Sequence, residues 1–300
     1  MSEIVFNTFV SSEMQETILA KLRMLEARED VQILFAIESG SRAWGFPSPD
    51  SDYDARFVYV RPADWYLSIT QGRDVIELPI EDSLDINGWD IKKALGLLLK
   101  PNPVLLEWLS SPIRYVWNDA VCQRLIKFSN RASHGPACLR HYLHLGGRQW
   151  NVYIEGKERV NLKRYFYIIR PAMAVRWIRL CPEAIPPMNF QELLEGVNLP
   201  SDLVSELNEL LIQKSRSKEV GEGPRISAID DFITSEFTWA RKAVNEYHAS
   251  RHDMKDEADA LFRTIVKEAD AGRMKRSQPW GATVSQTSHD ANGTISSKHE

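Results

Sequence analysis

The residues best suited to chemistry in this chain lie between Gly40 and Asp54. Gly40 and Ser41 form a small-residue turn whose backbone N–H groups can donate hydrogen bonds to a phosphate. Asp52 and Asp54 follow it, separated by one residue. Side chains alternate faces along a strand, so on a strand these two carboxylates project to the same side. Two such carboxylates beside a phosphate-binding turn predict a seat for Mg²⁺ carrying a nucleoside triphosphate.

Each half of this motif also has a plainer interpretation. A glycine-serine pair can end a strand in an ordinary turn, and two acids are tolerated on an exposed edge strand. However, residues 55–60, which follow Asp54, have the pattern of a half-buried strand. Two acids on one face repel each other unless a cation lies between them. We therefore interpret Asp52 and Asp54 as metal ligands and catalytic residues, and Gly40 with Ser41 as nucleotide ligands.

The formal net charge of −4 conceals two oppositely charged regions. Residues 30–90 contain twelve acids and four bases, whereas residues 131–180 contain ten bases and two acids. An acidic region that gathers cations, facing a basic region that attracts polyanions, suits a metal-bound triphosphate. The alternative is that these charges are solvated surface without a role.

The elements expected around these residues change character along the chain. The first half has a helix at residues 12–28, strands at residues 31–38, 52–60, 74–78 and 83–87, and helices at residues 90–100 and from residue 102. From about residue 120 the periodicity is helical, at residues 120–130, 137–151, 160–181, 190–196, 201–215 and 226–249. We predict a catalytic domain at residues 1–118, a helical domain at residues 119–271 and a disordered tail at residues 272–300.

Composition excludes several classes of protein. There is no apolar run of about 18 residues, which predicts no membrane span. Residues 1–10 lack the basic-then-apolar pattern of a secretory signal. Three cysteines in 300 residues cannot form a disulfide framework. A cytoplasmic protein is the expectation.

Longer words of the sequence resemble a known family. A Gly-Ser pair, a loop of about ten residues and then Asp-x-Asp on the next strand is the signature of the DNA polymerase beta-like nucleotidyltransferase superfamily. Within it the chain resembles the predicted nucleotidyltransferases associated with RNA ligases (RlaP-type). The matching words are GSRAWG at 40–45, SDYDARF at 51–57, DWYL at 64–67, GWDIKKAL at 88–95 and NPVLLEW at 102–108. The resemblance covers about residues 30–180 and, more weakly, the chain to about residue 265.

This resemblance implies an α+β fold: a minimal nucleotidyltransferase palm, with a short mixed sheet and helices, followed by an all-helical domain that closes the cleft. It also implies a third acid on a later strand. Asp85 is our choice because it lies in a short strand run just before a helix, although it could be a turn residue. Asp90 is better explained as the cap of that helix, and Glu77 is a weaker rival.

The resemblance further places a lysine of the helical domain on the phosphates, and Lys163 is the best match. On a helix Lys163, Tyr167 and Arg170 share one face, where Tyr167 could stack on the nucleotide and Arg170 could bind phosphate through two hydrogen bonds. The alternative is a solvated basic face beside the core. For Arg42 we expect a phosphate contact ahead of pairing with an acid.

A second surface could bind single-stranded RNA through Arg140 and Arg148, with aromatic side chains from Tyr142, Trp150 and Tyr153 between them. Aromatic residues at such spacing are more often part of a helix core. The sequence leaves both interpretations open.

The predicted activity is transfer of NMP from an NTP, with ATP favoured, to a hydroxyl group. The cofactor is Mg²⁺, with Mn²⁺ as an alternative metal. Asp52 and Asp54 would hold one ion on the triphosphate; Asp85, with Asp54, would hold a second and could take the hydroxyl proton. The acceptor best matched is an RNA end. The alternatives are a protein hydroxyl, as in nucleotidylating toxin–antitoxin pairs, and a catalytically silent nucleotide-binding module. The oligomeric state is left open.

Overall fold

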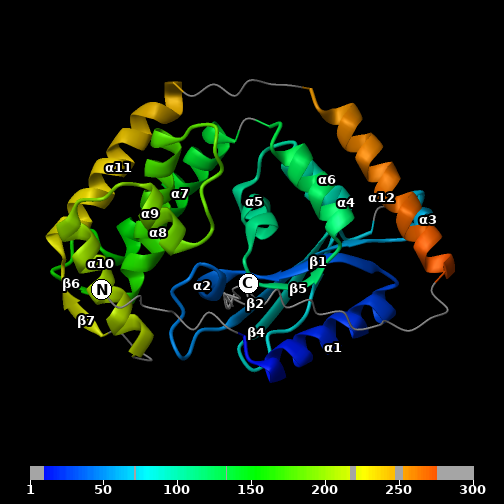
Figure 1. Cartoon of the computed structure of the whole chain (residues 1–300), viewed down its shortest axis with the longest axis horizontal. Helices are drawn as coiled ribbons and strands as arrows, with labels where there is room; N and C mark the ends of the chain where they lie inside the picture. Colours follow the sequence, from blue (N-terminus) through cyan, green and yellow to red (C-terminus); the bar gives the residue numbers. More distant parts are fainter. Residues whose placement is uncertain (1–9, 71, 133, 217–220, 247–252, 276–300) are drawn as a thin grey trace, which may run out of the picture.

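The computed structural model describes residues 10–70, 72–132, 134–216, 221–246 and 253–275. A five-stranded sheet with helices forms one lobe, and a mostly helical lobe lies beside it (Figure 1). This arrangement confirms the α+β fold class. The strands of the sheet are β1 (Gln32–Glu38), β2 (Tyr53–Val60), β3 (Val75–Glu77), β4 (Leu84–Asp90) and β5 (Arg114–Trp117).

The sheet is mixed, as expected for the palm of a nucleotidyltransferase. Its strand order is β3-β4-β2-β1-β5, in which β2 and β4 run parallel and the other neighbours run antiparallel. The helices of this part of the chain are α1 (Ser12–Glu29), α2 (Gly40–Ala43), α3 (Ala63–Tyr66), α4 (Ile91–Leu98), α5 (Pro103–Ser110) and α6 (Asp119–Ser129).

Local signals in the sequence set several of these boundaries. The Asp90 side chain accepts a hydrogen bond of 2.7 Å from the backbone N–H of Lys92, so Asp90 caps α4 as predicted. Asn102 caps α5 in the same way, with 3.0 Å to the N–H of Val104. The Asp90 cap starts α4 directly after β4 and thereby fixes where that strand ends, and the Asn102 cap starts α5 after α4.

The first sheet is covered on both faces. On one face Ile18 and Leu22 of α1 pack in a cluster with Ile33 and Phe57. On the other face Leu34, Val58 and other buried side chains join the core made by α4, α5 and α6. Because β1 is covered on both sides, six of its seven residues are buried, which explains its continuous apolar sequence.

The second lobe contains α7 (Gly135–Tyr153), α8 (Lys163–Leu180), α9 (Phe190–Gly196), α10 (Ser201–Arg216) and α11 (Ser227–Glu246), with the small antiparallel pair β6 (Arg159–Asn161) and β7 (Glu222–Pro224). The pair β6–β7 is a difference from the all-helical prediction. Each strand has three residues and its partner lies some sixty residues away, so no local pattern marks it.

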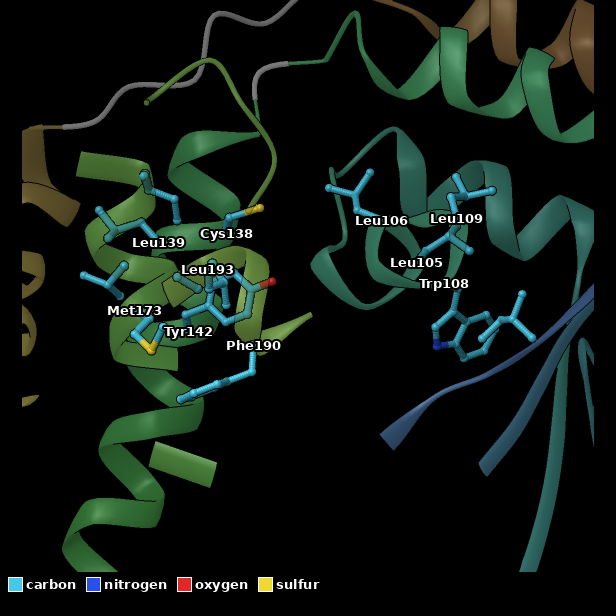
Figure 2. Close-up of a cluster of buried hydrophobic side chains, with 14 of the residues drawn as sticks. Leu105, Leu106, Trp108, Leu109, Cys138, Leu139, Tyr142, Met173, Phe190 and Leu193 are labelled. Carbon is cyan, nitrogen blue, oxygen red and sulfur yellow. The ribbon is translucent and has the colours of Figure 1, made fainter. Parts of the chain in front are cut away.

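Helix α5 joins the two lobes. Figure 2 shows side chains of α5 and of the helical lobe that belong to one buried cluster. At the centre of this junction Glu107 of α5 accepts hydrogen bonds from Tyr142 of α7, at 2.7 Å, and from Arg170 of α8, at 2.8 Å. A buried carboxylate with a cationic and a neutral donor holds the lobes in one relative orientation.

The last described helix, α12 (Lys255–Lys275), leaves the helical lobe and packs on the first lobe, on the side of the sheet where α4 and α6 lie (Figure 1). Asp270 accepts a hydrogen bond of 3.2 Å from the N–H of Ala63, and Arg273 donates one of 3.0 Å to the carbonyl of Val60. The sequence reading had no helix here. The predicted tail begins inside α12, and its residues 276–300 lie outside the described residues.

In the parts of the chain that the structure describes, no helix combines the length and apolarity needed to cross a membrane.

Candidate active site

The turn after β1 is shaped by Gly40. The φ of Gly40 is +60°, a value that residues with a Cβ rarely adopt. Gly40 is also the first residue of the four-residue helix α2. A Cβ at this position would lie 2.0 Å from Oδ2 of Asp54. Glycine is therefore required twice, for the backbone conformation and because the Asp54 carboxylate lies directly against it. The hydroxyl of Ser41 is 3.0 Å from that of Ser51, on the loop that leads to β2.

Asp54 and Asp85 lie opposite each other in the parallel pair β2–β4. Both contact the same atom, Nη2 of Arg56, at 2.9 Å from Asp54 Oδ1 and 2.7 Å from Asp85 Oδ2. Burial raises the pKa of Asp54; Arg56 opposes this shift, whereas the charges of Asp85 and Asp52 add to it. The structure thus brings the two predicted carboxylates, which lie on separate strands, together around the positive charge of Arg56.

Asp52 lies one residue before β2 and is exposed. Its charge is close enough to raise the pKa of Asp54 and that of Tyr167. Among the described residues, no group of three or more His, Cys, Asp or Glu side chains is assembled tightly enough to hold a metal ion. In this structure the Arg56 guanidinium is the cation between the acids.

The two rivals for the third acid are engaged elsewhere. Asp90 is buried at the start of α4, where it also accepts a 2.8 Å hydrogen bond from the hydroxyl of Tyr66. Glu77 lies on the edge strand β3, opposite Asn87, which donates to it at 3.0 Å. Neither carboxylate is hydrogen-bonded to Arg56, so the geometry favours Asp85.

Arg42 supports the loop rather than facing open space. Its guanidinium donates to the carbonyls of Ser51, at 2.8 Å, and Asp52, at 3.2 Å, and lies 3.9 Å from the centre of the Tyr53 ring. The side chain is nearly buried. The sequence favours a phosphate, ahead of an acid, as the partner of Arg42. In this structure its guanidinium contacts two backbone carbonyls and the Tyr53 ring. Arg42 thereby fixes the approach of the chain to β2.

Two of the three residues predicted on α8 lie near the acidic loop before β2. Lys163 Nζ is 3.8 Å from Oδ1 of Asp50, on the loop before the acids. Tyr167 is half-buried, and burial raises its pKa, with a further rise from the charges of Asp54, Asp52 and Asp50. Both side chains therefore face the acidic loop from α8.

Arg170, the third, is in the core. It is buried, donates to Glu107 at 2.8 Å and to the carbonyl of Met188 at 3.0 Å, and its guanidinium carbon lies 4.7 Å from the centre of the Trp44 ring. Its hydrogen bonds are used for joining the lobes. In this structure Arg170 is a packing residue next to the turn and does not face the acids.

Two buried titratable residues beside the site were missed by the sequence reading. Glu38, the last residue of β1, accepts a 2.9 Å hydrogen bond from the N–H of Asp54 and another from the hydroxyl of Tyr115. Burial raises the pKa of Glu38 to about 7, and the nearby Asp54 charge adds to that rise. An acid at the end of an otherwise apolar strand, directly before the turn, was the signal available for it.

Lys214 of α10 is completely buried and donates to the carbonyl of Phe46. Its ammonium lies 4.5 Å from the Phe46 ring and 5.4 Å from the Phe166 ring. Burial lowers the pKa of Lys214 to about 7; Lys163 pushes in the same direction and Asp50 opposes it. The position shares the helix face of buried Leu207 and Leu211, and a lysine on such a face was the signal.

The helical lobe holds the end of the turn after β1 through the backbone carbonyls of residues 44–46. The N–H of Phe190 donates to Trp44 at 2.8 Å, the side chain of Gln191 donates to Gly45 at 2.7 Å, and Lys214 donates to Phe46. The conformation of the turn therefore depends on side chains from α9 and α10 as well as on its own sequence.

Comparison with known proteins gives this geometry a family. A curated relative, the uncharacterized protein YcgL of Bacillus subtilis (strain 168), is 42% identical over 255 residues, which cover 85% of this chain and 97% of that protein. A solved nucleotidyltransferase-like protein from Exiguobacterium sibiricum 255-15 aligns over 88% of this chain and 82% of its own, but with 11% identity and a TM-score of 0.28 it carries no argument. The family model for RlaP matches residues 14–264. The chain therefore belongs to the RlaP family, the RNA repair pathway DNA polymerase beta family, as the words around its turn and its acids predicted.

Proposed function

We propose that this protein transfers a nucleoside monophosphate from an NTP to the hydroxyl of an RNA end, with Mg²⁺ as the cofactor. The observation that carries the proposal is the convergence of Asp54 and Asp85 on Nη2 of Arg56, directly against the Gly40 turn. Half-buried carboxylates gathered around a positive charge are a donor set that suits a divalent cation. Membership of a DNA polymerase beta family agrees with this chemistry.

The residues present fit a metal ion. Asp54 and Asp85 would be its ligands once the Arg56 side chain moves aside, and the exposed carboxylate of Asp52 is free to join them. When bound, Mg²⁺ neutralises phosphate charge and lowers the pKa of an attacking hydroxyl. Mn²⁺ prefers the same oxygen ligands and is expected to substitute.

The chain's own residues would bind and orient the two substrates. The Gly40–Ser41 turn offers backbone N–H groups and a hydroxyl to the triphosphate, and Lys163 with Tyr167 approaches it from the helical lobe. The acceptor hydroxyl oxygen forms a bond to the α-phosphorus, and the bond from that phosphorus to the bridging oxygen of the β-phosphate breaks. Pyrophosphate leaves with the bonding electrons, and the hydroxyl proton passes to the carboxylate of Asp85.

RNA is favoured as the acceptor for two reasons. The family is described by an RNA repair pathway, and residues 131–180, which include all of α7 and α8, carry a large excess of bases. A polyanionic acceptor would be attracted to that lobe. ATP is the favoured donor.

The test is to incubate the full chain with each α-labelled NTP and Mg²⁺, and with either RNA or cell extract. Label in RNA supports the proposal. Label on a protein band would instead support protein nucleotidylation. If no label is transferred, and Asp52→Ala leaves NTP affinity unchanged with and without Mg²⁺, the chain is a silent binding module.

Two variants make the roles specific. Asp85→Asn should abolish transfer, whereas Asp82→Asn, in the turn just before β4, should not. The control changes the same charge, and asparagine tolerates the φ of +46° at position 82. Lys163→Ala should weaken triphosphate binding several-fold. Full turnover by Asp85→Asn, or unchanged NTP affinity in Lys163→Ala, would remove that residue from the site.

A further inference from the structure

A groove of about 460 Å³ runs between α7 and α11, away from the acids of the first lobe. Its polar side chains include Arg140 and Arg148 from α7 and Arg241 from α11. All three are exposed. No carboxylate lines the groove among the residues that the structure describes. The charge of this surface is therefore strongly and uniformly positive.

The three arginines differ from four others of the helical lobe, each of which is paired with a carboxylate. Arg176 and Arg179 both bond the buried Glu236, and Arg225 bonds Asp230, as Arg170 bonds Glu107. Within the described ranges, by contrast, the guanidinium groups of the three groove arginines form no hydrogen bond, ion pair or ring contact. Their charge is available to an external anion.

The shape of the groove favours an extended, narrow ligand. Arg140 and Arg148 lie eight residues apart on α7, about 12 Å along the helix. Between them Gly147 lines the groove, and a Cβ there would meet nothing within 4 Å, so the wall is open at this point.

For Tyr142 the structure supports the helix-core interpretation over a role in this surface. Tyr142 is buried, and its hydroxyl is bonded to Glu107 in the junction of the lobes. The apolar side chains that line the groove are Leu143, Val152 and Val244, which offer no ring for base stacking. Contacts here would therefore be to phosphates and insensitive to base sequence.

The groove is linked to the active site by further basic residues. Val152 lines the groove and precedes Tyr153, the last residue of α7, and the guanidinium carbon of Arg164 lies 4.2 Å from the centre of the Tyr153 ring. The neighbouring Lys163 reaches Asp50, on the loop before the catalytic acids. A strand that followed these charges from the groove would bring its end toward the acids.

We propose that the α7–α11 groove binds the phosphate backbone of the single-stranded RNA that carries the acceptor end. The proposal rests on the proposed function for the identity of its ligand and on the unpaired arginines for its location. It extends the predicted Arg140–Arg148 surface to Arg241, which lies far away in the sequence.

The test is fluorescence anisotropy of a labelled 20-nucleotide single-stranded RNA with the full chain, without NTP, over a series of KCl concentrations. Three phosphate contacts contribute about −2 to the slope of log K against log[salt] for a single strand. The triple variant Arg140→Gln, Arg148→Gln, Arg241→Gln should lose that part of the slope and bind at least tenfold more weakly at low salt.

A matched control removes three exposed, unpaired charges from helices of the other lobe: Arg23→Gln, Arg263→Gln, Lys267→Gln. It should bind RNA as the wild type does. Equal binding by the groove variant, tighter binding of an RNA hairpin than of the single strand, or no RNA binding by the wild type would each overturn the proposal. If the groove variant binds RNA as the wild type does but no longer labels a protein in cell extract, the groove binds a protein acceptor instead. NTP binding, measured on the same preparations, tests the active site separately.

Discussion

Arg56 occupies the position between Asp54 and Asp85 that a metal ion would take, and this competition can be measured. The two carboxylate oxygens lie within about 5.6 Å of each other, the sum of their distances to Nη2. At an effective dielectric constant of about 20, two like charges at that distance repel by about 3 kcal/mol, and in a water-like medium by less than about 1 kcal/mol. The side chains are 28% and 33% exposed, so the true value lies between these limits.

The substitution Arg56→Met keeps the length of the side chain and removes its charge. Without metal, we expect a loss of about 1–3 kcal/mol in the free energy of unfolding, because the two acids then face each other without a counter-ion. With metal the order reverses, since an ion entering the variant no longer displaces a guanidinium. Mn²⁺ affinity should rise by about 5- to 150-fold, which is the same free energy expressed as a ratio of binding constants.

The assays are thermal unfolding with and without Mg²⁺, and Mn²⁺ binding measured by electron paramagnetic resonance. Arg73→Met is the control, because Arg73 pairs with Glu77 at an exposed edge of the same sheet. It should change stability by no more than about 0.5 kcal/mol and leave Mn²⁺ affinity unchanged. If Arg56→Met is as stable as the wild type and binds Mn²⁺ no more tightly, Arg56 is not the counter-ion of the two acids.

Two further predictions concern the turn and the residue behind it. Gly40→Ala should lower nucleotide transfer at least a hundredfold and destabilise the fold by at least about 1 kcal/mol, because the new Cβ would meet Asp54 and the φ of position 40 is positive. The control is Gly96→Ala, where a Cβ meets nothing within 4 Å, and it should have neither effect. The pKa of Glu38 is raised from 4.5 to about 7, so between these pH values the folded state holds a proton that the unfolded state has lost. The free energy of unfolding contributed by this group therefore falls by up to about 3 kcal/mol as pH rises from 4.5 to 7. Glu38→Gln should flatten the stability profile over this range in urea unfolding at several pH values; an unchanged slope would show that Glu38 does not titrate there.

The parts of the site that the sequence reading located are those whose partners are close in sequence or in strand register. Gly40 and Asp54 belong to one short segment, whose length leaves few ways to fold. Asp85 was placed because a strand run before a capped helix is a local pattern, and the parallel pairing of β2 with β4 then sets it opposite Asp54. Periodicity also predicted that Lys163 and Tyr167 share a helix face.

The residues that the sequence reading misplaced depend on distant partners. Arg170 shares the periodicity of Lys163, but Glu107 of α5 lies 63 residues away and takes its guanidinium into the core. No pattern in α8 marks that partner. The contacts of α12 with Ala63 and Val60 are likewise about 200 residues distant, so its packing on the first lobe could not be predicted from its own sequence. Secondary structure follows from local composition, whereas the partner of a charged side chain follows from the whole fold.

The geometry also makes the turn beside the acids depend on the helical lobe. Asp54 and Asp85 lie on the first lobe, but the turn that faces them is held through the carbonyls of residues 44–46 by α9 and α10. Gly45, with φ of +84°, is part of this contact, because a Cβ there would lie 2.2 Å from the side-chain oxygen of Gln191. Residues 1–118 alone would therefore carry the acids without the hydrogen bonds that shape the phosphate-binding turn. A nucleotide that contacts the turn and Lys163 together would bind both lobes, and its affinity would depend on how firmly they are joined.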